Sequence, residues 1–335
     1  LVFGSLGVLW VGARFSEAPL GALTSALALA SALAVALLEL LLPDREGEVS
    51  WRTLRTDLLH VLLSGSGVSM LVRALSFGGL AALGALLAQR LGFGLWPSAW
   101  PWPVQLALAA VIGELGAYTA HRLMHRYEAL WRIHALHHSP PHLYIVASAR
   151  THPFNAALVH FSQMAPVVLL GAGPEVIAGF SLLTAVVGLL QHCNADLATE
   201  WLNGVFATPD LHRTHHSVVL EESNTNFGNN LIVWDWVFGT RLAGARPAAY
   251  GVEGVTWPEG YLAQLTVPFV YARLSAAPPL AASLRATSAA KRCAAGHTWR
   301  GLGFGRARGR VRVRVKVRVR LRVSRCARGA LHLHH

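Results

Sequence analysis

Long apolar stretches dominate the first two thirds of the chain. A helix that crosses a membrane needs about 20 consecutive, mostly apolar residues, and residues 20–42 meet this requirement with Glu39 as their single charged side chain. Residues 58–91 are apolar for longer than one crossing needs, so they fit either one tilted helix or two helices that break around residues 76–79. This pattern predicts an all-α integral membrane protein.

Three more apolar stretches follow these two. Residues 104–124 form one of them, and residues 155–172 and 175–191 form a pair that is separated by Gly173-Pro174. Because a Gly-Pro dipeptide is a turn signal, the pair is predicted to be a helical hairpin. With residues 58–91 counted as one or two helices, we expect about four to six transmembrane helices.

The loops between these stretches assign a side of the membrane. Residues 92–103 contain three tryptophans and no charge, which is typical of an interfacial belt on the translocated side. Arginines concentrate in other loops, which the positive-inside rule assigns to the cytoplasm: 43–57, 122–150 and 213–246. We therefore predict a multi-pass protein with residues 122–154 and 192–250 together on the cytoplasmic face, in a bacterial inner membrane.

Charge divides the chain unevenly. The sequence has 29 Lys and Arg side chains against 17 Asp and Glu, a formal net charge of +12 that on its own would suggest a nucleic-acid partner. Fifteen of the basic side chains, and none of the acidic ones, lie in residues 285–335, so the rest of the chain has a net charge of −3. We therefore predict a near-neutral membrane body without a nucleic-acid partner, followed by a basic low-complexity tail.

The tail has a pattern of its own. Residues 311–323 alternate apolar and cationic side chains, a period of two that suits a strand with one cationic face. Basic runs can bind phosphate, but the lack of acidic side chains and the scarcity of aromatic ones favour an irregular or disordered extension. A shifted reading frame in GC-rich DNA would also produce this arginine and valine monotony.

Histidine carries the candidate chemistry. Twelve of the 17 histidines lie between residues 121 and 216, and eight of these form one H-x-x-x-H and two H-x-x-H-H motifs: His121 and His125; His134, His137 and His138; His212, His215 and His216. On a helix, positions i, i+3 and i+4 share a face, so each motif is expected to aim its imidazoles at one point. Imidazole suits Fe, Zn, Cu and Ni. Eight imidazoles exceed the needs of one ion, so two metal ions are predicted.

Other residues are interpreted less specifically. The isolated histidines are expected to be surface or hydrogen-bonded side chains: His60, His142, His160, His297, His332, His334 and His335. The three cysteines, Cys193, Cys293 and Cys326, show no C-x-x-C spacing and predict neither a disulfide framework nor a zinc ribbon.

The three histidine motifs resemble the signature of the fatty acid hydroxylase/sterol desaturase superfamily, which comprises integral-membrane, non-haem di-iron oxygenases. Flanking residues resemble the family as well: R-I-H-A-L-H-H-S at 132–139, R-T-H-P at 150–153, Q-H-C-N at 191–194, L-H-R-T-H-H-S at 211–217 and N-F-G at 226–228. The resemblance covers about residues 100–245. It is specific for the superfamily and says little about the substrate.

The resemblance implies a ligand set and a reaction. The eight motif histidines would hold two iron ions, with His152 and His192 completing the shell. The enzyme would use O2 to hydroxylate or desaturate a membrane lipid (a sterol, fatty acyl, sphingoid or ether lipid), with electrons from a ferredoxin or a b5-type cytochrome. No side chain beyond the metal ligands is predicted to be catalytic, and no cofactor-binding motif such as G-x-G-x-x-G is found.

Ligand histidines need acceptors for their second ring nitrogen, which fix the tautomer and the ring orientation. Glu114 lies seven residues before His121, on the same face of the helix, and is one predicted partner. Asn194 and Asp196 are the other two. These features divide the chain into four regions: an N-terminal transmembrane region (1–99), a catalytic region (100–245), a C-terminal segment of the core (246–284) and the basic tail (285–335).

Two other classes of function stay open at this point. A zinc-dependent membrane hydrolase would use the H-x-x-x-H spacing, but the zincin motif needs Glu directly after its first histidine, where this chain has Arg122. A non-enzymatic metal transporter would bind its ion near the middle of the bilayer, whereas these motifs lie at helix ends and in arginine-bearing loops. The O2-dependent lipid oxidoreductase is therefore the leading hypothesis.

Overall fold

A computed structural model describes residues 1–15 and 18–275 of the chain. Within these ranges the protein is helical, with isolated β-bridges and no strand, which confirms the predicted all-α class. The basic tail, its alternating stretch 311–323 and the residues Cys293, Cys326 and His297 lie outside the described residues.

Five long helices form the apolar part of the protein: α2 (Leu20–Leu41), α4 (Val68–Leu91), α5 (Trp102–Arg126), α7 (Pro153–Leu169) and α8 (Pro174–His192). Among the described residues, α2, α5 and α8 are long and apolar enough to cross a membrane, and two shorter apolar helical stretches lie at Val2–Arg14 and, within α4, at Gly78–Leu91. The N-terminal helix α1 (Val2–Phe15) packs on α2 and α8, where Ser5 Oγ and Ser31 Oγ share a 3.1 Å hydrogen bond.

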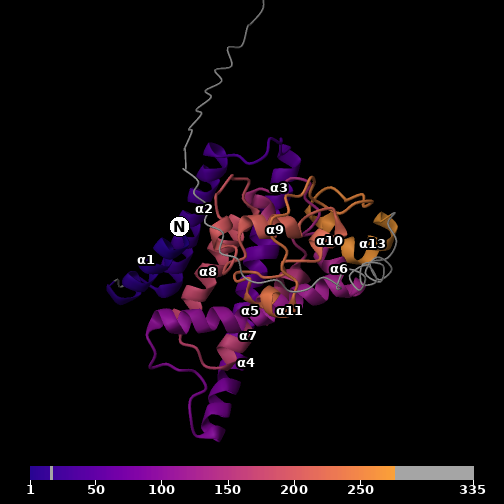
Figure 1. The fold of residues 1–335 in the computed structure, drawn as a ribbon. Coiled ribbons are helices and arrows are strands. Elements are labelled where there is room, and N and C mark those ends of the chain that lie inside the picture. Colours follow the sequence, from indigo (N-terminus) through magenta and orange to yellow (C-terminus); the bar gives the residue numbers. More distant parts are fainter. Residues whose placement is uncertain (16–17, 276–335) are drawn as a thin grey trace, which may run out of the picture. The chain divides into compact units, whose positions relative to one another are not determined.

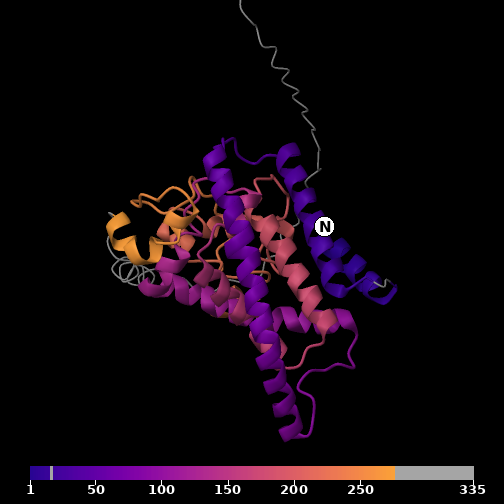
Figure 2. The same ribbon diagram turned by 180° about the vertical axis from the view of Figure 1, so that it is seen from behind.

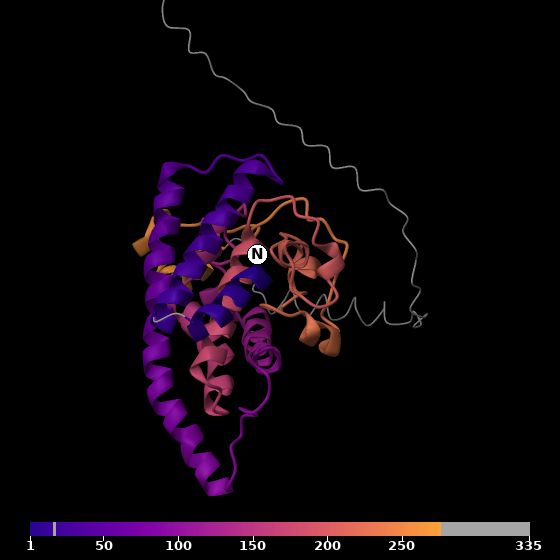
Figure 3. The same ribbon diagram turned by 90° about the vertical axis from the view of Figure 1, so that its left-hand side faces the viewer.

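The apolar stretch after residue 58 forms one continuous helical rod. Helix α3 (Trp51–Leu59) leads into a π-helical segment, η1 (His60–Gly67), and then into α4 without a break (Figures 2 and 3). The sequence left open a break around residues 76–79, and the irregularity lies earlier, in η1. Wide π-helical turns often occur at functional sites, and η1 contributes to the main cavity described below.

Small residues allow the long helices to approach closely. A side chain at Gly116 of α5 would collide with the backbone carbonyl of Ser162 in α7, and one at Gly113 would collide with the ring of Phe180 in α8. Small residues at such crossings let helix backbones pack tightly within a membrane. Phe180 is completely buried in the apolar core that α5, α7 and α8 share.

Short helices and loops cover the C-terminal ends of α5 and α8 (Figure 1). They are α6 (Glu128–His134), η2 (Ile145–Ala149), η3 (Glu200–Leu202), α9 (Pro209–His215), α10 (Leu220–Ser223), α11 (Val233–Phe238), α12 (Tyr261–Gln264) and α13 (Val267–Leu274). Most of these helices are too short to be stable alone, so packing against the long helices has to stabilise them.

Buried polar groups fasten this cap to the α3–η1 rod. The Asp57 carboxylate of α3 is fully buried, and it accepts hydrogen bonds from Nε and Nη2 of Arg150 at 2.6 and 2.7 Å. His60, in η1, is also fully buried, with Nδ1 3.1 Å from Ser64 Oγ and Nε2 2.9 Å from Gln264 Oε1. His60 therefore has the structural role that the sequence predicted for isolated histidines.

Candidate metal centre

Nine histidines from four segments of the chain converge in two adjacent groups. The five-histidine group consists of His121, His125, His134, His138 and His215, and the four-histidine group consists of His137, His192, His212 and His216. Within each group the candidate ligand nitrogens all lie within 4.8 Å of one another. Because metal–imidazole bonds are about 2.0–2.1 Å long, each group has dimensions close to those of one coordination shell.

The helix ends position these side chains. His121 and His125 lie in the last turns of α5, and His192 is the last residue of α8. His134 ends α6, and His137 and His138 lie in the turn after it, while the third motif lies on and directly after α9. The histidines thus come from the part of the chain where the cap meets the long helices.

Each H-x-x-H-H motif divides between the two groups, instead of pointing at one place as expected. The first and last histidines of each motif, four residues apart, join the same group, and the middle one joins the other group. With about 100° between successive residues on a helix, positions i and i+4 lie about 40° apart, whereas i+3 projects about 100° away from i+4. Each motif therefore contributes to both sites, and the rings of His138 and His216 stack between the groups with centroids 4.5 Å apart.

Ring nitrogens face one another within both groups. In the five-histidine group, Nε2 of His134 lies 3.0 Å from Nε2 of His121 and 3.1 Å from Nε2 of His138. In the four-histidine group, Nε2 of His212 lies 3.0 Å from Nε2 of His192 and 3.1 Å from Nε2 of His216. Distances this short need either a proton or a cation between the two nitrogens.

Protons are disfavoured at these positions. Burial lowers the pKa well below the ordinary histidine value in six of the histidines outside the long apolar helices, and the neighbouring histidines lower it further: His134, His137, His138, His212, His215 and His216. Neutral imidazole is the form that binds metal ions. Among the described residues, His215 Nε2 is also buried without a hydrogen-bond partner while its Nδ1 is bonded, so its lone pair is available to a metal ion. The donor set therefore fits two transition-metal ions.

Acceptors on the protein fix three rings of the five-histidine group. Nδ1 of His121 lies 2.9 Å from the carbonyl oxygen of Phe227, and Nδ1 of His215 lies 2.7 Å from that of Thr225. Nδ1 of His134 lies 2.9 Å from Oδ1 of Asn155. When Nδ1 donates its proton in this way, Nε2 keeps a lone pair that points toward the centre of the group.

Two buried carboxylates hold the loop that supplies one of these acceptors. Glu114 accepts hydrogen bonds from the backbone N–H groups of Asn229 and Asn230, and Asp235 accepts those of Phe227 and Gly228, both at 2.8 Å. Four successive amides are thus fixed, and the Phe227 carbonyl is held against His121. Glu114 acts on the metal centre through this loop and not by direct contact with a histidine ring.

The remaining predicted residues lie elsewhere. His152 belongs to neither group, because its Nδ1 accepts a hydrogen bond from the backbone N–H of Phe154 and its Nε2 lies 3.2 Å from the carbonyl oxygen of Leu265. The side chain of Asn194 binds the backbone of Arg45 on both sides, with Nδ2 donating at 2.8 Å and Oδ1 accepting at 3.1 Å. Asp196 is exposed.

Sequence reasoning missed three of the supporting groups. Asn155, Asp235 and the carbonyl oxygen of Phe227 have no spacing that would single them out, because they lie outside the histidine motifs in sequence and only the folded chain brings them to the histidines or to the loop beside them. The N-F-G segment at 226–228 is the one available signal. A side chain at Gly228 would collide with the carbonyl oxygen of Leu231, so the loop needs glycine there.

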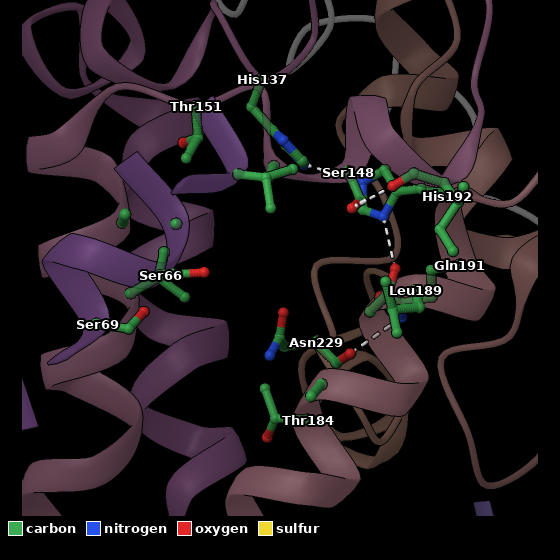
Figure 4. A pocket seen from close by; sticks show the side chains of 18 of the residues that line it. Ser66, Ser69, His137, Ser148, Thr151, Thr184, Leu189, Gln191, His192 and Asn229 are labelled. Carbon is green, nitrogen blue, oxygen red and sulfur yellow. Dashed lines mark hydrogen bonds between the residues drawn. The ribbon is translucent and has the colours of Figure 1, made fainter. Parts of the chain in front are cut away.

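A cavity of about 770 Å³ adjoins both groups. Figure 4 shows His137 and His192 at one end, with Ser66 and Ser69 on one wall and Thr184 and Asn229 on the opposite wall. Small and aliphatic residues of α2, α7 and α8 form much of the remaining lining, which also includes exposed leucines of α2 and α3: Leu29, Leu33 and Leu58. The lining therefore extends from exposed apolar side chains to the histidines.

Comparisons with known proteins find relatives among lipid hydroxylases and monooxygenases. The fatty acid hydroxylase family model matches residues 106–240. The chain is 40% identical over 244 residues to the ornithine lipid hydroxylase OlsE of Rhizobium tropici, an alignment that covers 70% of this chain and 72% of that protein. It is 29% identical over 179 residues to the alkylglycerol monooxygenase of Danio rerio, covering 52% of this chain and 37% of that one.

A plant sterol enzyme is more distantly similar. The chain is 22% identical over 138 residues to methylsterol monooxygenase 2-2 of Arabidopsis thaliana, covering 41% of this chain and 52% of that protein. No solved structure matches the chain.

Proposed function

Because the chain belongs to the fatty acid hydroxylase family, we propose that it is a membrane-bound di-iron oxygenase that uses O2 to hydroxylate a lipid. The protein is an oxidoreductase, since the named relatives are lipid hydroxylases and monooxygenases. One observation carries the proposal: two adjacent groups of buried imidazoles lie at the end of a cavity that opens at exposed leucines.

Each histidine group would bind one iron ion. Iron bound there would supply the activation of O2 and the oxidation of an unactivated C–H bond. The protein orients the ligands through the Nδ1 acceptors of His121, His134 and His215, and it buries these three rings away from solvent. The ligand set that we propose omits His152, which lies in neither group.

The shape of the cavity supports a lipid substrate. Sites for small molecules usually measure about 300–1,000 Å³, so a cavity of about 770 Å³ takes part of a lipid. An opening at Leu33 of α2 and Leu58 of α3, which line the cavity and are exposed, would admit that part directly from the bilayer. The serine, threonine and asparagine side chains inside it would hydrogen-bond the oxygen or nitrogen atoms of a polar lipid.

The comparisons support hydroxylation and a polar lipid. The relative with 40% identity is named for action on an ornithine lipid, whereas the sterol enzyme is only 22% identical. We therefore place a polar membrane lipid before a sterol as the substrate class, and hydroxylation before desaturation.

The electrons would come from outside the chain. Its sequence has no motif for a flavin, nicotinamide or haem cofactor, so an external one-electron donor, a ferredoxin or a b5-type cytochrome, would reduce the iron. We place the histidine-bearing cap on the cytoplasmic side of a bacterial inner membrane, because the loops that carry it are the arginine-bearing ones. The family match to residues 106–240 supports residues 100–245 as the catalytic region.

Lipid mass spectrometry tests this function. Bacteria that produce the protein should contain a lipid with one oxygen more than the lipid of matched cells without it, and a loss of two hydrogens would indicate desaturation instead. Cells that produce the His137→Ala variant should lack the new species, while those with His142→Gln, a histidine outside both groups, should keep it. Purified protein that holds zinc alone and gives no O2-dependent product would contradict the proposal.

A further inference from the structure

One oxidisable aromatic side chain lies directly against the metal centre. Trp131 of α6 is buried, and its ring centroid lies 5.1 Å from that of His125 and 5.4 Å from that of His138. Phe227 contacts the same group from another side, with its centroid 5.2 Å from that of His125. An indole ring gives up an electron far more readily than a phenyl ring, so Trp131 is the contact that a strong oxidant in this group would attack.

Trp131 is the inner end of a chain of aromatic side chains. Its indole N–H donates a 2.8 Å hydrogen bond to the hydroxyl oxygen of Tyr271 in α13. The Tyr271 ring centroid lies 6.4 Å from that of Trp257. Tyr271 and Trp257 are both half-buried, so the chain leads from the five-histidine group to the protein surface through three contacts.

The Tyr271 phenol is neutral at physiological pH. Burial raises its pKa above the ordinary tyrosine value, although the hydrogen bond from Trp131 partly offsets this effect. A neutral phenol keeps its proton until it is oxidised. Because the hydroxyl is part of a half-buried side chain, that proton can leave for solvent at the moment of oxidation and return afterwards.

We propose that Trp131, Tyr271 and Trp257 form an electron route that discharges the oxidised metal centre when no substrate C–H bond is within reach. This inference rests on the proposed oxygenase function. An enzyme that oxidises unactivated C–H bonds would otherwise oxidise its own ligands whenever O2 is activated without substrate. The route would instead move the oxidising equivalent to the surface, where it can be removed without harm.

The electrons and protons balance as follows. One electron passes from the Trp131 indole to the centre, Tyr271 and then Trp257 replace it in turn, and a low-molecular-weight thiol at the surface restores Trp257. Two such passages oxidise two thiols to one disulfide and release two protons. The two electrons, with two protons from solvent, would be consumed in reducing an oxygen atom to water at iron bound in the five-histidine group. Apart from the Tyr271 O–H bond, which breaks and re-forms, no bond within the protein changes.

Mapping of oxidised residues tests this route without measuring lipid turnover. The full chain, loaded with iron in detergent, is treated with hydrogen peroxide in the absence of lipid and of thiol, and its peptides are analysed by mass spectrometry. We expect added oxygen at Trp257 and Tyr271 in the unmodified protein. In Trp131→Phe these additions should be lost, and oxidation should move to the histidines of the five-histidine group. Zinc-loaded protein should show neither.

Two further variants make the test specific. Trp236→Phe removes an exposed tryptophan of α11 that is outside the route, and its oxidation map should match that of the unmodified protein. Tyr271→Phe keeps the ring and removes only the hydroxyl at a half-buried position, so it interrupts the route with little change in packing. It therefore tests the route in case Trp131→Phe does not fold. Equal histidine oxidation in the unmodified protein and in the Trp131→Phe and Tyr271→Phe variants would overturn the inference.

The same preparation separates this inference from the proposed function. If the unmodified protein binds iron and makes the hydroxylated lipid but the oxidation map does not depend on Trp131 or Tyr271, only the electron route is wrong. If it makes no oxidised lipid under any condition, the oxygenase function itself is wrong.

Discussion

The two histidine groups differ in how firmly the protein holds them. In the five-histidine group, three rings have an acceptor for Nδ1: His121, His134 and His215. In the four-histidine group, Nδ1 of His192 lies 2.9 Å from the carbonyl oxygen of Gly188, while Nδ1 of His212 and His216 is buried without a hydrogen-bond partner among the described residues.

The groups also differ in their position relative to the cavity. Three members of the four-histidine group line it, His137, His192 and His212, compared with two of the five in the other group, His121 and His134. Partners of the second ring nitrogen are typically worth about 10–100-fold in metal affinity. An ion bound in the five-histidine group would therefore be held more tightly than one bound in the four-histidine group, which lies closer to the cavity.

The largest expected effect comes from the removal of one ligand from either group. His125→Ala and His137→Ala should each lower product formation by at least about 100-fold, because losing a ligand costs more than losing a supporting partner, which itself costs about 10–100-fold. Metal analysis should show about one ion per chain in each variant. The His142→Gln variant is the control for the purification. Undiminished activity in His137→Ala would refute its assignment as a ligand.

The second largest effect is expected in metal removal by a chelator, which should distinguish the two histidine groups by their rates of metal release. We expect two phases of metal release from the unmodified protein, with the four-histidine group losing its ion first. The metal affinities of the two groups should differ by about 10–100-fold, which is the change in affinity that hydrogen-bond partners of the second ring nitrogen typically cause. The His125→Ala and His137→Ala variants, each keeping one group, identify the phases. His137→Ala keeps the five-histidine group and His125→Ala keeps the four-histidine group. If His137→Ala lost its ion faster than His125→Ala, the five-histidine group would be the weaker site.

A change at Asn155 should reduce the difference between the groups. Asn155→Leu removes the acceptor of His134 Nδ1 at similar volume, so the affinity of the five-histidine group should fall by about tenfold, the lower end for a supporting partner. The two phases of release should then move together. Thr151→Val is the matched control, because it removes the hydrogen bond between Thr151 and Asn155 but leaves the acceptor of His134 in place. A separation that stays unchanged in Asn155→Leu would show that this acceptor does not set the affinity.

The sequence predicted that these nine histidines converge, but it did not predict their division into two groups. The spacing of the motifs and the helical hairpin were sufficient to bring His121, His137 and His212 to one part of the fold, because both depend on local geometry. The division of each H-x-x-H-H motif depends on the angle at which a short helix faces the centre. That angle is set by packing of the cap, which leaves no periodic signal in the sequence.

The supporting residues show the same limit. Glu114 was recognised from its position on the face of His121, yet it acts through the backbone of Asn229 and Asn230, about 115 residues away in sequence. Asn194 and Asp196 were predicted as acceptors for ligand rings, but the chain leaves α8 in an extended conformation at Cys193. Asn194 binds the backbone of Arg45 instead, and Asp196 is exposed.

The smallest expected effect concerns Glu114 and Asp235, whose buried carboxylates hold the backbone of residues 227–230 and so support the five-histidine group indirectly. Glu114→Gln keeps one acceptor oxygen for the amides of Asn229 and Asn230, so one buried N–H is left poorly bonded, at a cost of about 1–3 kcal/mol in the free energy of unfolding. His121 keeps its own acceptor, so metal affinity should fall less than in Asn155→Leu. Reversible unfolding in detergent measures the first effect and chelator competition the second. Asp235 binds the backbone N–H groups of Phe227 and Gly228, next to the Phe227 carbonyl oxygen that accepts from His121. Asp235→Asn should therefore lower the metal affinity more than Glu114→Gln does. The opposite order would show that these carboxylates do not act on the metal affinity through the Phe227 carbonyl.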